Sequence, residues 1–388
     1  MTDISAQPWM TGEAADLFAM ATEFFGREVP AGREKWEAQQ HVDRSFWRKC
    51  GELGLLCVNA PVEYGGGGGS FLHQATIQEA YARLGDRSWG NTIHSGVVAD
   101  YISDYGTGEQ CRRWLPKMAT GEMLGALAMT EPSGGSDLKA LRTRAVRTDE
   151  GWRISGSKTF ITNGGSADLV LVACSTDPSK GSRGISLVVV EAKDAAGFTR
   201  GRPLSKLGQH GADTTELHFD DVLVPASNLL GQEGQGFAIM MGKLPQERLM
   251  IGITAVNAIE LAVAVTTDYV AERNAFGGPL LDKQHVRFEL AECATLAKVA
   301  RVFLNECIRV HLSAGLDLAT SSMCKWWLTD IQCQVVDRCL QLHGGYGYMT
   351  EYTIARLYAD ARAQRIYGGT NEIQKELIAR SLKATGRY

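Results

Sequence analysis

The four residues from Tyr367 to Thr370, Tyr-Gly-Gly-Thr, have the composition of a ligand-binding turn but carry no carboxylate, imidazole or amine. Glycines let a backbone approach a ligand closely, and the apolar residues that follow this turn recur at helical spacing. We expect Thr370 to cap that helix, with Asn371 and Glu372 in its first turn. Helix N-terminal N–H groups favour an anionic ligand. Acid–base chemistry here would need a group from elsewhere in the chain.

Glu247 is a carboxylate that could supply it. The segment KLPQERLMIG is expected to start a long helix with Pro245 at its first position, which places Glu247 and Arg248 in the first turn. A positioned carboxylate is a common general base. Acidic residues also occur in first turns simply because they complement the helix dipole, and an arginine there is often a surface cation. The spacing alone leaves both interpretations open.

Two further segments carry small and polar residues of the kind that contact ligands. In LAMTEPSGGSD (127–137), small residues allow close backbone approach and Ser136 offers a hydroxyl, although a polar turn that opens a strand would look the same. In KTFITNGG (158–165), Phe160 and Thr162 fall on one face of a predicted strand. They could equally be an aromatic core residue and an ordinary strand former.

Other features favour ordinary structural roles when taken alone. Arg273, in ERNAFGGPLLDKQ, could be a solvated cation at a helix end, and His343, in QLHGGYGY, could be a packed histidine. The five glycines at 65–69 do not match G-x-G-x-x-G and no Lys-Ser/Thr follows, so we predict a flexible helix–helix connection. We find no HExxH or paired Cys-His spacing, and therefore predict no metal site. A G-x-S-x-G nucleophile motif is also missing.

Hydrophobic periodicity divides the chain into three regions, which we place at 1–121, 122–234 and 235–388. The first is predicted to be helical, with helices over 14–29, 33–56 and 71–85. The second contains β-branched runs with no helix between them, which predicts an antiparallel β-domain. The third is predicted to be a helix bundle built on 245–276, 283–312 and 319–343. The fold class is therefore α+β.

Composition restricts the function classes. The chain of 388 residues has 40 basic and 44 acidic side chains, a net charge of −4, without the basic excess of a nucleic-acid binder. Its nine scattered cysteines form no CxxC pair, which indicates free thiols in a reducing compartment. Neither terminus shows a targeting signal, and no apolar run approaches the ~20 residues of a membrane span. We predict a soluble cytoplasmic protein.

Taken together, the segments 127–137, 158–165, 272–284 and 341–352, followed by IYGGTNEIQ, resemble the acyl-CoA dehydrogenase family over nearly the whole chain. The resemblance implies a helical domain, a barrel-like β-domain and a four-helix bundle. It further implies an FAD enzyme, usually a homotetramer built as a dimer of dimers. Such enzymes desaturate acyl-CoA thioesters between Cα and Cβ and pass electrons to an electron-transfer flavoprotein.

The resemblance also assigns binding residues. For FAD it implies Leu127, Met129, Thr130, Gly135, Ser136, Phe160, Thr162, Arg273, Phe276, Gln284, Gln341, Gly344, Gly345, Thr370, Asn371 and Glu372. Phe160 would pack on the flavin ring and Thr162 would bond its N5 edge. Arg273 and Gln284 would reach an FAD held mostly by a neighbouring subunit. For the substrate it implies Ser136, Arg248, Tyr367 and Gly369.

Gly368 departs from the family pattern. Many members carry the catalytic glutamate between this tyrosine and glycine, whereas the long-chain and isovaleryl branches carry it at the helix position of Glu247. LPQERL resembles the long-chain branch, so we assign Glu247 as the base that takes the α-proton while hydride leaves Cβ for flavin N5. The Gly368 N–H would bind the thioester oxygen. The alternatives are a flavin oxidase or monooxygenase of the same fold and a catalytically silent flavoprotein.

Overall fold

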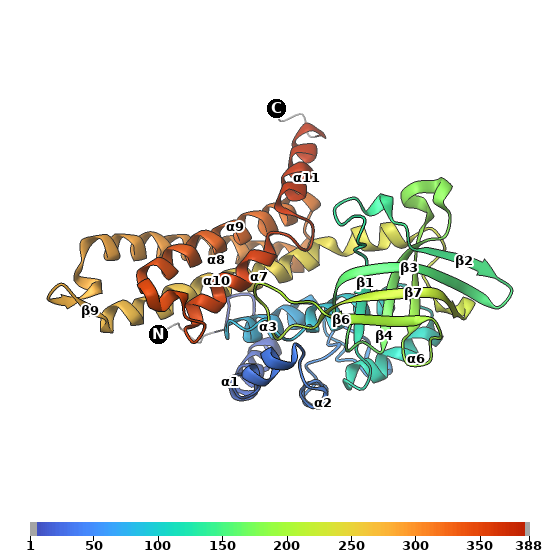
Figure 1. Ribbon diagram of the computed structural model, residues 1–388, viewed down its shortest axis with the longest axis horizontal. Coiled ribbons are helices and arrows are strands. Elements are labelled where there is room, and N and C mark those ends of the chain that lie inside the picture. The colour runs from blue at the N-terminus through green and yellow to red at the C-terminus, as the bar shows by residue number, and fades with distance from the viewer. Residues whose placement is uncertain (1–5, 385–388) are drawn as a thin grey trace.

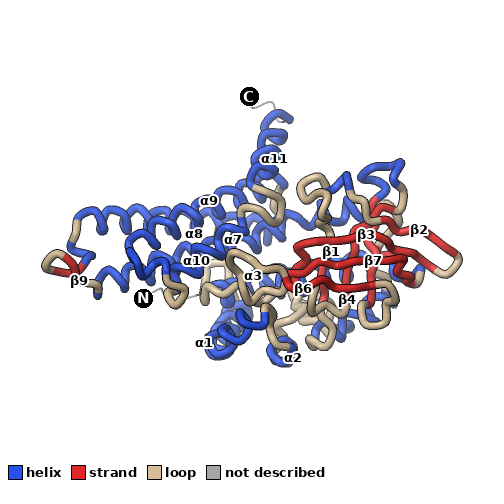
Figure 2. The backbone as a smooth tube through the Cα atoms, viewed as in Figure 1, coloured by secondary structure: helices blue, strands red, loops and turns tan. Residues whose placement is uncertain are grey.

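The computed structural model describes residues 6–384 and arranges them along one long axis (Figure 1). The sheet lies at one end, the long C-terminal helices extend to the other, and α1 and α2 lie below their junction. In Figure 2 the strands gather at the sheet end, apart from the short β9–β10 hairpin at the far tip. This order of helices, sheet and helices confirms the predicted α+β class.

The N-terminal part is helical, as predicted, but its boundaries differ. Its elements are α1 (Glu13–Gln39), α2 (Arg44–Glu52), η1 (Val62–Tyr64), α3 (Phe71–Ala82), α4 (Asn91–Ile93), the π-helical η2 (His94–Ala99), α5 (Asp100–Tyr105) and α6 (Gly108–Ala119). The helix expected over 33–56 is split, because Gln40 adopts a left-handed φ of 60° after α1. Helix α3 ends before Gly85, whose φ is +59°.

The glycine run at 65–69 is a packed turn and not a flexible connection. The N–H of Gly68 donates to Ala60 O at 2.9 Å, and the N–H of Gly69 donates to Val58 O at 2.8 Å. A Cβ added at Gly66 would lie 2.2 Å from Ala60 O. These glycines are therefore needed for close backbone packing, which composition alone does not reveal.

The β-domain is one curled sheet. Its strands are β1 (Gly125–Ala128), β2 (Arg144–Thr148), β3 (Gly151–Thr162), β4 (Leu169–Ser175), β5 (Ile185–Glu191), β6 (Phe198–Pro203), β7 (Thr214–Val224) and β8 (Leu229–Leu230). Their order is β6-β7-β3-β2-β4-β5-β8, with β1 on β4. The predicted antiparallel β-domain is confirmed for most strand pairs, whereas β1 and β4 run parallel, as do β2 and β4 at one residue pair. The β2–β3 hairpin separates β1 from β4 along the chain, so a parallel pair forms without a crossover helix.

The C-terminal part is a bundle with one further helix. Its elements are α7 (Gly236–Glu272), β9 (Asn274–Ala275), β10 (Gly278–Pro279), α8 (Gln284–Ala314), α9 (Leu318–His343), α10 (Thr353–Gln364) and α11 (Asn371–Ala384). Helices α7 to α10 form the predicted four-helix bundle, and α11 packs on α9 and projects from its side in Figure 1. Short 3₁₀ turns connect elements throughout: η3 (Leu138–Ala140), η4 (Pro178–Gly184), η5 (Ala226–Asn228), η6 (Leu280–Asp282) and η7 (Gly344–Tyr348).

Helix α7 begins nine residues earlier than expected. The prediction that Pro245 occupies the first helical position is wrong, because the helix starts at Gly236 and Pro245 lies inside it. The apolar residues that precede the proline continue the helix by packing into the core, which outweighs the cost of the missing N–H. Glu247 therefore lies well inside α7, and the helix dipole does not account for its presence.

Within residues 6–384, α7 is also the one helix long and apolar enough to cross a bilayer by length and composition. We expected no such run from the sequence. In the structure, 67% of its most apolar window is buried inside the molecule. Its central place in the bundle accounts for that composition without a bilayer.

Two apolar cores meet at the sheet. Strand β4 is buried along its whole length: Leu169 and Leu171 pack with the helical core, and Val170 and Val172 fill the inside of the curled sheet. Period-two alternation sends successive side chains to the two sides. The sheet is thereby fixed against the helices that carry the site. All nine cysteines are free thiols, as predicted.

Candidate active site

Glu247 points toward α5, where the Tyr101 hydroxyl donates a hydrogen bond of 2.8 Å to Glu247 Oε1. The Glu247 side chain is only partly exposed, and burial raises its pKa to about 7 against the opposing effects of the Tyr101 hydrogen bond and the Arg248 charge. Within residues 6–384, no second hydrogen bond to this carboxylate is formed. A carboxyl with a pKa near neutrality is suited to general base catalysis.

Gly368 lies against the same helix. Its φ is +65°, and a Cβ built there would lie 2.5 Å from Cδ1 of Ile251. Ile251 is four residues after Glu247, so the two side chains are neighbours on α7. Among residues 6–384, no acceptor bonds the Gly368 N–H, and the residue is partly exposed. The structure thus brings Gly368 against the Ile251 side chain, and Ile251 lies about one helical turn from Glu247 on α7.

A second group of predicted residues converges on one face of the sheet. Phe160 is 66% exposed with a φ of 59°, an unusual combination for a bulky side chain that often marks a functional site. The end of β1 is fixed beside β3, because Thr159 N donates to Thr130 O at 2.9 Å. Partly or fully exposed around Phe160 are Leu127, Met129, Thr130, Gly135, Ser136 and Thr162.

A buried ion pair supports this face from beneath. Lys158 is fully buried, and its Nζ donates to Met129 O at 2.9 Å and to Glu131 Oε1 at 3.0 Å. Glu131 also accepts hydrogen bonds from the N–H groups of Arg142 and Thr143. Because both charges are satisfied, the pair holds the 127–137 segment in one position against β3.

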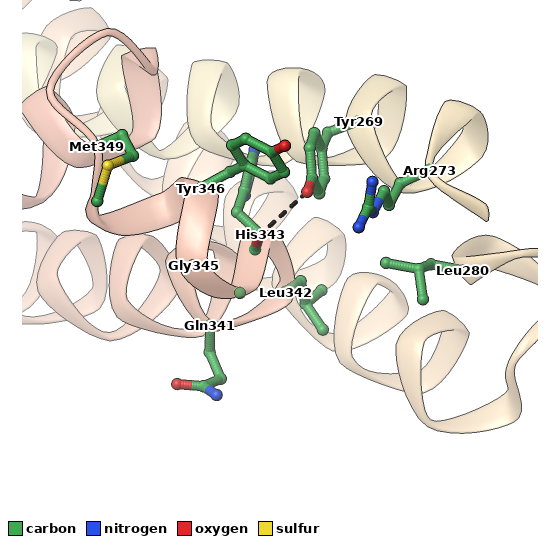
Figure 3. Close-up of a pocket in the computed structure, with 10 residues that line it drawn as sticks. Tyr269, Arg273, Leu280, Gln341, Leu342, His343, Gly345, Tyr346 and Met349 are labelled. Atoms are coloured by element: carbon green, nitrogen blue, oxygen red, sulfur yellow. Dashed lines mark hydrogen bonds between the residues drawn. The ribbon is translucent and has the colours of Figure 1, made fainter. Parts of the chain in front are cut away.

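A third group lies at the far end of the bundle. The end of α7, the end of α9 and the turn that follows surround a cavity of about 480 Å³ (Figure 3). A Cβ at Gly344 or Gly345 would meet nothing within 4 Å, so both backbones border open space. The lining residues are Tyr269, Arg273, Leu280, Gln341, Leu342, His343, Gly344, Gly345, Tyr346 and Met349. The predicted residues Phe276 and Gln284 are exposed nearby, with Phe276 92% exposed.

The turn that opens α11 has the predicted cap. Thr370 Oγ1 accepts a hydrogen bond of 3.3 Å from Ile373 N, and Glu372 is exposed. Asn371 is only 1% exposed, and its Oδ1 accepts from Lys325 Nζ at 2.8 Å. The same ammonium group donates to Gly369 O at 2.8 Å. Asn371 therefore presents its backbone, and not its side chain, to any ligand at this turn.

Two predicted substrate residues have protein partners. Arg248 is 2% exposed, and its Nη1 donates to Ser322 Oγ at 3.1 Å inside the bundle. Arg248 is therefore buried inside the bundle, whereas Ser136 and Gly369 are exposed. Tyr367 is partly exposed, and its Oη accepts a hydrogen bond of 3.2 Å from Arg87.

Comparison with known proteins identifies the fold and the chemistry. The family models for the N-terminal, middle and C-terminal domains of acyl-CoA dehydrogenases match residues 11–122, 126–222 and 234–383. This chain belongs to the acyl-CoA dehydrogenase family. The mitochondrial long-chain specific acyl-CoA dehydrogenase of Rattus norvegicus is 44% identical over 384 residues, which cover 98% of this chain and 89% of the relative.

Solved structures support the same family assignment. An acyl-CoA dehydrogenase from Geobacillus kaustophilus is 45% identical, with a TM-score of 0.94 over 97% of this chain and 100% of that one. An acyl-CoA dehydrogenase from Bacillus anthracis complexed with FAD is 30% identical, with a TM-score of 0.91 over 99% of this chain and 69% of that one. The chain is therefore an FAD-dependent oxidoreductase that acts on CH–CH groups of acyl-CoA.

The exposed residues of this acyl-CoA dehydrogenase fit FAD. A planar ring system needs an exposed aromatic or apolar face, which Phe160, Leu127 and Met129 offer. A pyrophosphate needs cations and free N–H groups, and Arg273 is exposed at the edge of the cavity, 5.6 Å above the Tyr346 ring. The open space beside the far-end glycines admits a ligand without any backbone movement.

These two groups are far apart in one subunit. Glu247, near the sheet, and Arg273, beside the cavity, are 26 residues apart on or at the end of α7, which corresponds to about 39 Å along its axis. In Figure 1 the sheet and the β9 hairpin lie at opposite ends of the molecule.

The sequence did not reveal three residues that shape the site: Tyr101, Ile251 and Lys158. The contact between Tyr101 and Glu247 spans 146 positions, so no local pattern contains it. For Lys158 the sequence contained a weak indication. A lysine in a predicted strand with alternating burial needs a buried partner if its side chain points inward. Within residues 6–384, no cluster of His, Cys, Asp and Glu has the arrangement of a metal site.

Proposed function

We propose that Glu247 is the base that removes the α-proton of an acyl-CoA thioester, while the Gly368 N–H binds the thioester oxygen. The observation that carries this proposal is that Gly368, whose N–H has no acceptor within residues 6–384, lies against Ile251, one helical turn along α7 from the near-neutral Glu247 carboxyl. Proton removal beside a thioester builds negative charge on its oxygen, which a fixed donor stabilises. Bound FAD supplies the acceptor for the hydride that leaves Cβ.

The roles of the other residues follow from their positions. Phe160 and Thr162 would bind the flavin ring, and Ser136 would lie between cofactor and substrate. The turn at Gly369 is held by Lys325, which keeps the Gly368 donor in place. The LPQER sequence and the 44% identity to a long-chain specific relative favour a long-chain acyl thioester as substrate.

The test is Glu247→Gln, which keeps the size and the hydrogen-bond acceptor for Tyr101 but removes the base. Each enzyme is loaded with FAD and mixed anaerobically with a series of acyl-CoA thioesters while the flavin absorbance is followed. We expect the wild-type flavin to bleach and the variant flavin to stay oxidised, with acyl-CoA affinity retained. Glu306→Gln, an exposed carboxylate on α8, is the matched control. Bleaching of the Glu247→Gln flavin at a near-normal rate would refute the assignment.

We further infer that the electrons pass to an electron-transfer flavoprotein. A purified electron-transfer flavoprotein should reoxidise the bleached enzyme faster than air does. Rapid oxygen consumption without any need for CoA would favour the rival oxidase or monooxygenase. A flavin that stays oxidised with every thioester would favour the silent flavoprotein. The partly buried carboxylate at Glu247 speaks against a monooxygenase, which needs no α-proton base, and its retention speaks against a silent flavoprotein.

The proposed assembly is a homotetramer in which FAD is shared between subunits. Its support is the separation of the Phe160 and Arg273 groups, which a second copy of the chain would bring together. An apolar hollow of about 370 Å³ on α8 and α9 offers a surface for further contacts. Its lining residues are Val299, Phe303, Met323, Trp326 and Trp327. A cytoplasmic location stays a prediction, since the first five and last four residues lie outside the described part.

Mixed assemblies test the sharing. One chain carries Arg273→Ala and the other carries Phe160→Ala, and each alone should retain little FAD. A shared site predicts that co-expression restores FAD, because a mixed pair contains one site with neither change. Sites contained within one chain would leave every site of the mixed pair damaged, and FAD would stay low.

A further inference from the structure

We infer that Tyr101 is a positioning residue for the catalytic base: its hydroxyl fixes Glu247 through Oε1 and leaves Oε2 to take the proton. This inference rests on the proposed role of Glu247. Tyr101 is 1% exposed and its Oη donates to Glu247 Oε1 at 2.8 Å. Within residues 6–384, Oε2 has no hydrogen-bond partner, so the two oxygens differ in availability.

The phenol is a permanent donor. Burial and the charge of Glu247 raise the pKa of Tyr101 well above its usual value, so its proton stays in place throughout the working pH range. A donor to the ionised carboxylate favours that form, which lowers the pKa of Glu247 against the effect of burial. Tyr101 thus offsets part of the effect of burial, so that the base remains ionisable near neutral pH.

Neighbouring charged groups also affect the pKa of Glu247. On α5, Asp100 raises the pKa of Glu247; on α7, Lys243 and Arg248 lower it. Lys243 donates to Asp100 Oδ2 at 2.8 Å and to Asp104, which fixes α5 against α7 at this level. The hydroxyl of Tyr101 is the group that touches the base directly.

The backbone before Tyr101 explains why it faces α7. The π-helical η2 precedes α5, and such a turn contains one more residue than an α-helical turn. One residue corresponds to about 100° of rotation, so the π turn changes which face of α5 meets α7. Gly96 lets this turn pack closely against α3, because a Cβ there would lie 1.9 Å from Gln74 Nε2. π turns are common at functional sites.

The first test is Tyr101→Phe, which removes only the hydroxyl. We expect the acid limb of the pH profile for flavin bleaching to move upward by about one to two pH units, since a hydrogen bond to a charged group is lost. The rate at pH 6 should fall tenfold or more, recover partly at high pH, and be accompanied by little change in KM. Tyr105→Phe, on the same helix and 36% exposed, is the control and should leave the limb unchanged.

A second variant gives the opposite shift. Difluorotyrosine at position 101 keeps the shape of the side chain but donates more strongly, so the acid limb should move downward. Unchanged limbs in both variants would overturn the inference. A lower FAD content with an unchanged limb would show a purely structural role and would overturn it as well.

The pKa of Glu247 can be read without turnover. Infrared difference spectra between each protein and its Glu247→Gln counterpart isolate the C=O stretch of the protonated Glu247 carboxyl, and can be titrated in the FAD-free protein. An upward shift in Tyr101→Phe supports the inference, and an unchanged titration contradicts it. If Glu247→Gln keeps its activity, the proposed function fails, while the infrared titration still decides whether Tyr101 controls this carboxyl.

Discussion

Replacing Gly368 with alanine should damage stability and rate through two separable effects. The φ of +65° at this residue is left-handed, which costs a side chain with a Cβ about 1–2 kcal/mol. The new Cβ would also lie 2.5 Å from Cδ1 of Ile251, an overlap that forces a side chain or the turn to move. Overpacking of this kind costs about 1–3 kcal/mol. The two costs together predict a loss of roughly 2–5 kcal/mol in unfolding free energy.

Gly54→Ala separates these two costs. Gly54 has a φ of +69°, and a Cβ there meets no atom within 4 Å, so this variant measures the backbone cost alone. Denaturant titrations of both variants should show Gly368→Ala to be the less stable by the overlap cost. If the two variants lose equal stability, Ile251 does not fill the space beside Gly368 and the packing argument is wrong.

The rate of flavin bleaching gives the second result. Movement of the 367–370 turn would displace the Gly368 N–H from the thioester oxygen, and loss of one such donor costs about 10²–10³ in rate. We expect a fall of that order in Gly368→Ala with acyl-CoA binding largely retained. A variant that is destabilised but reacts at the wild-type rate would refute the role of this N–H.

Three further predictions follow from charge and burial. Burial raises the pKa of Glu247 to about 7. The stability that this carboxyl contributes is therefore present below pH ~4.5 and lost as pH rises through 7. Relative to the wild type, Glu247→Gln should gain up to about 3 kcal/mol of unfolding free energy between pH 4.5 and pH 8. Lys158→Met should cost about 3 kcal/mol and lower the FAD content by leaving Glu131 buried without its cation, and Glu131→Gln should restore part of the loss. Val299→Glu in the apolar hollow should give a smaller assembly by light scattering, whereas Val146→Glu, at a 58% exposed position on β2, should not.

The sequence indicated candidate ligand-binding segments because each is a local pattern. The Phe160 strand face and the Thr370 cap depend on neighbours in the chain, and the structure contains both. Contacts between distant segments had no such signal, which is why the Tyr101 hydroxyl and the Ile251 side chain were missed. The parallel β1–β4 pair was missed for the same reason, since Leu127 pairs with Leu171 across an intervening hairpin.

The misplaced start of α7 shows how a local preference can mislead. Proline favours the first helical position, so Pro245 was taken as a start signal. Burial of residues such as Ile239 and Met240 extends the helix past that signal. The correction strengthens the functional interpretation of Glu247, because the helix-dipole explanation applies only to a first turn.

The catalytic carboxylate should be movable from position 247 to position 368 only if Ile251 is replaced as well. A glutamate at position 368, combined with Glu247→Thr, places a carboxylate where many family members carry one, but its Cβ would overlap Ile251. We expect this double variant to be unstable and inactive, and addition of Ile251→Ala to restore stability by removing the overlap and to return measurable bleaching. The left-handed φ remains and Ile251→Ala removes a partly buried side chain, so recovery should stop at least about 1–2 kcal/mol short of the wild type. If the triple variant is no more stable than the double variant, backbone strain and not Ile251 excludes a side chain at position 368. If the triple variant is stable but inactive, the base needs the fixed support that Tyr101 gives Glu247 on α7.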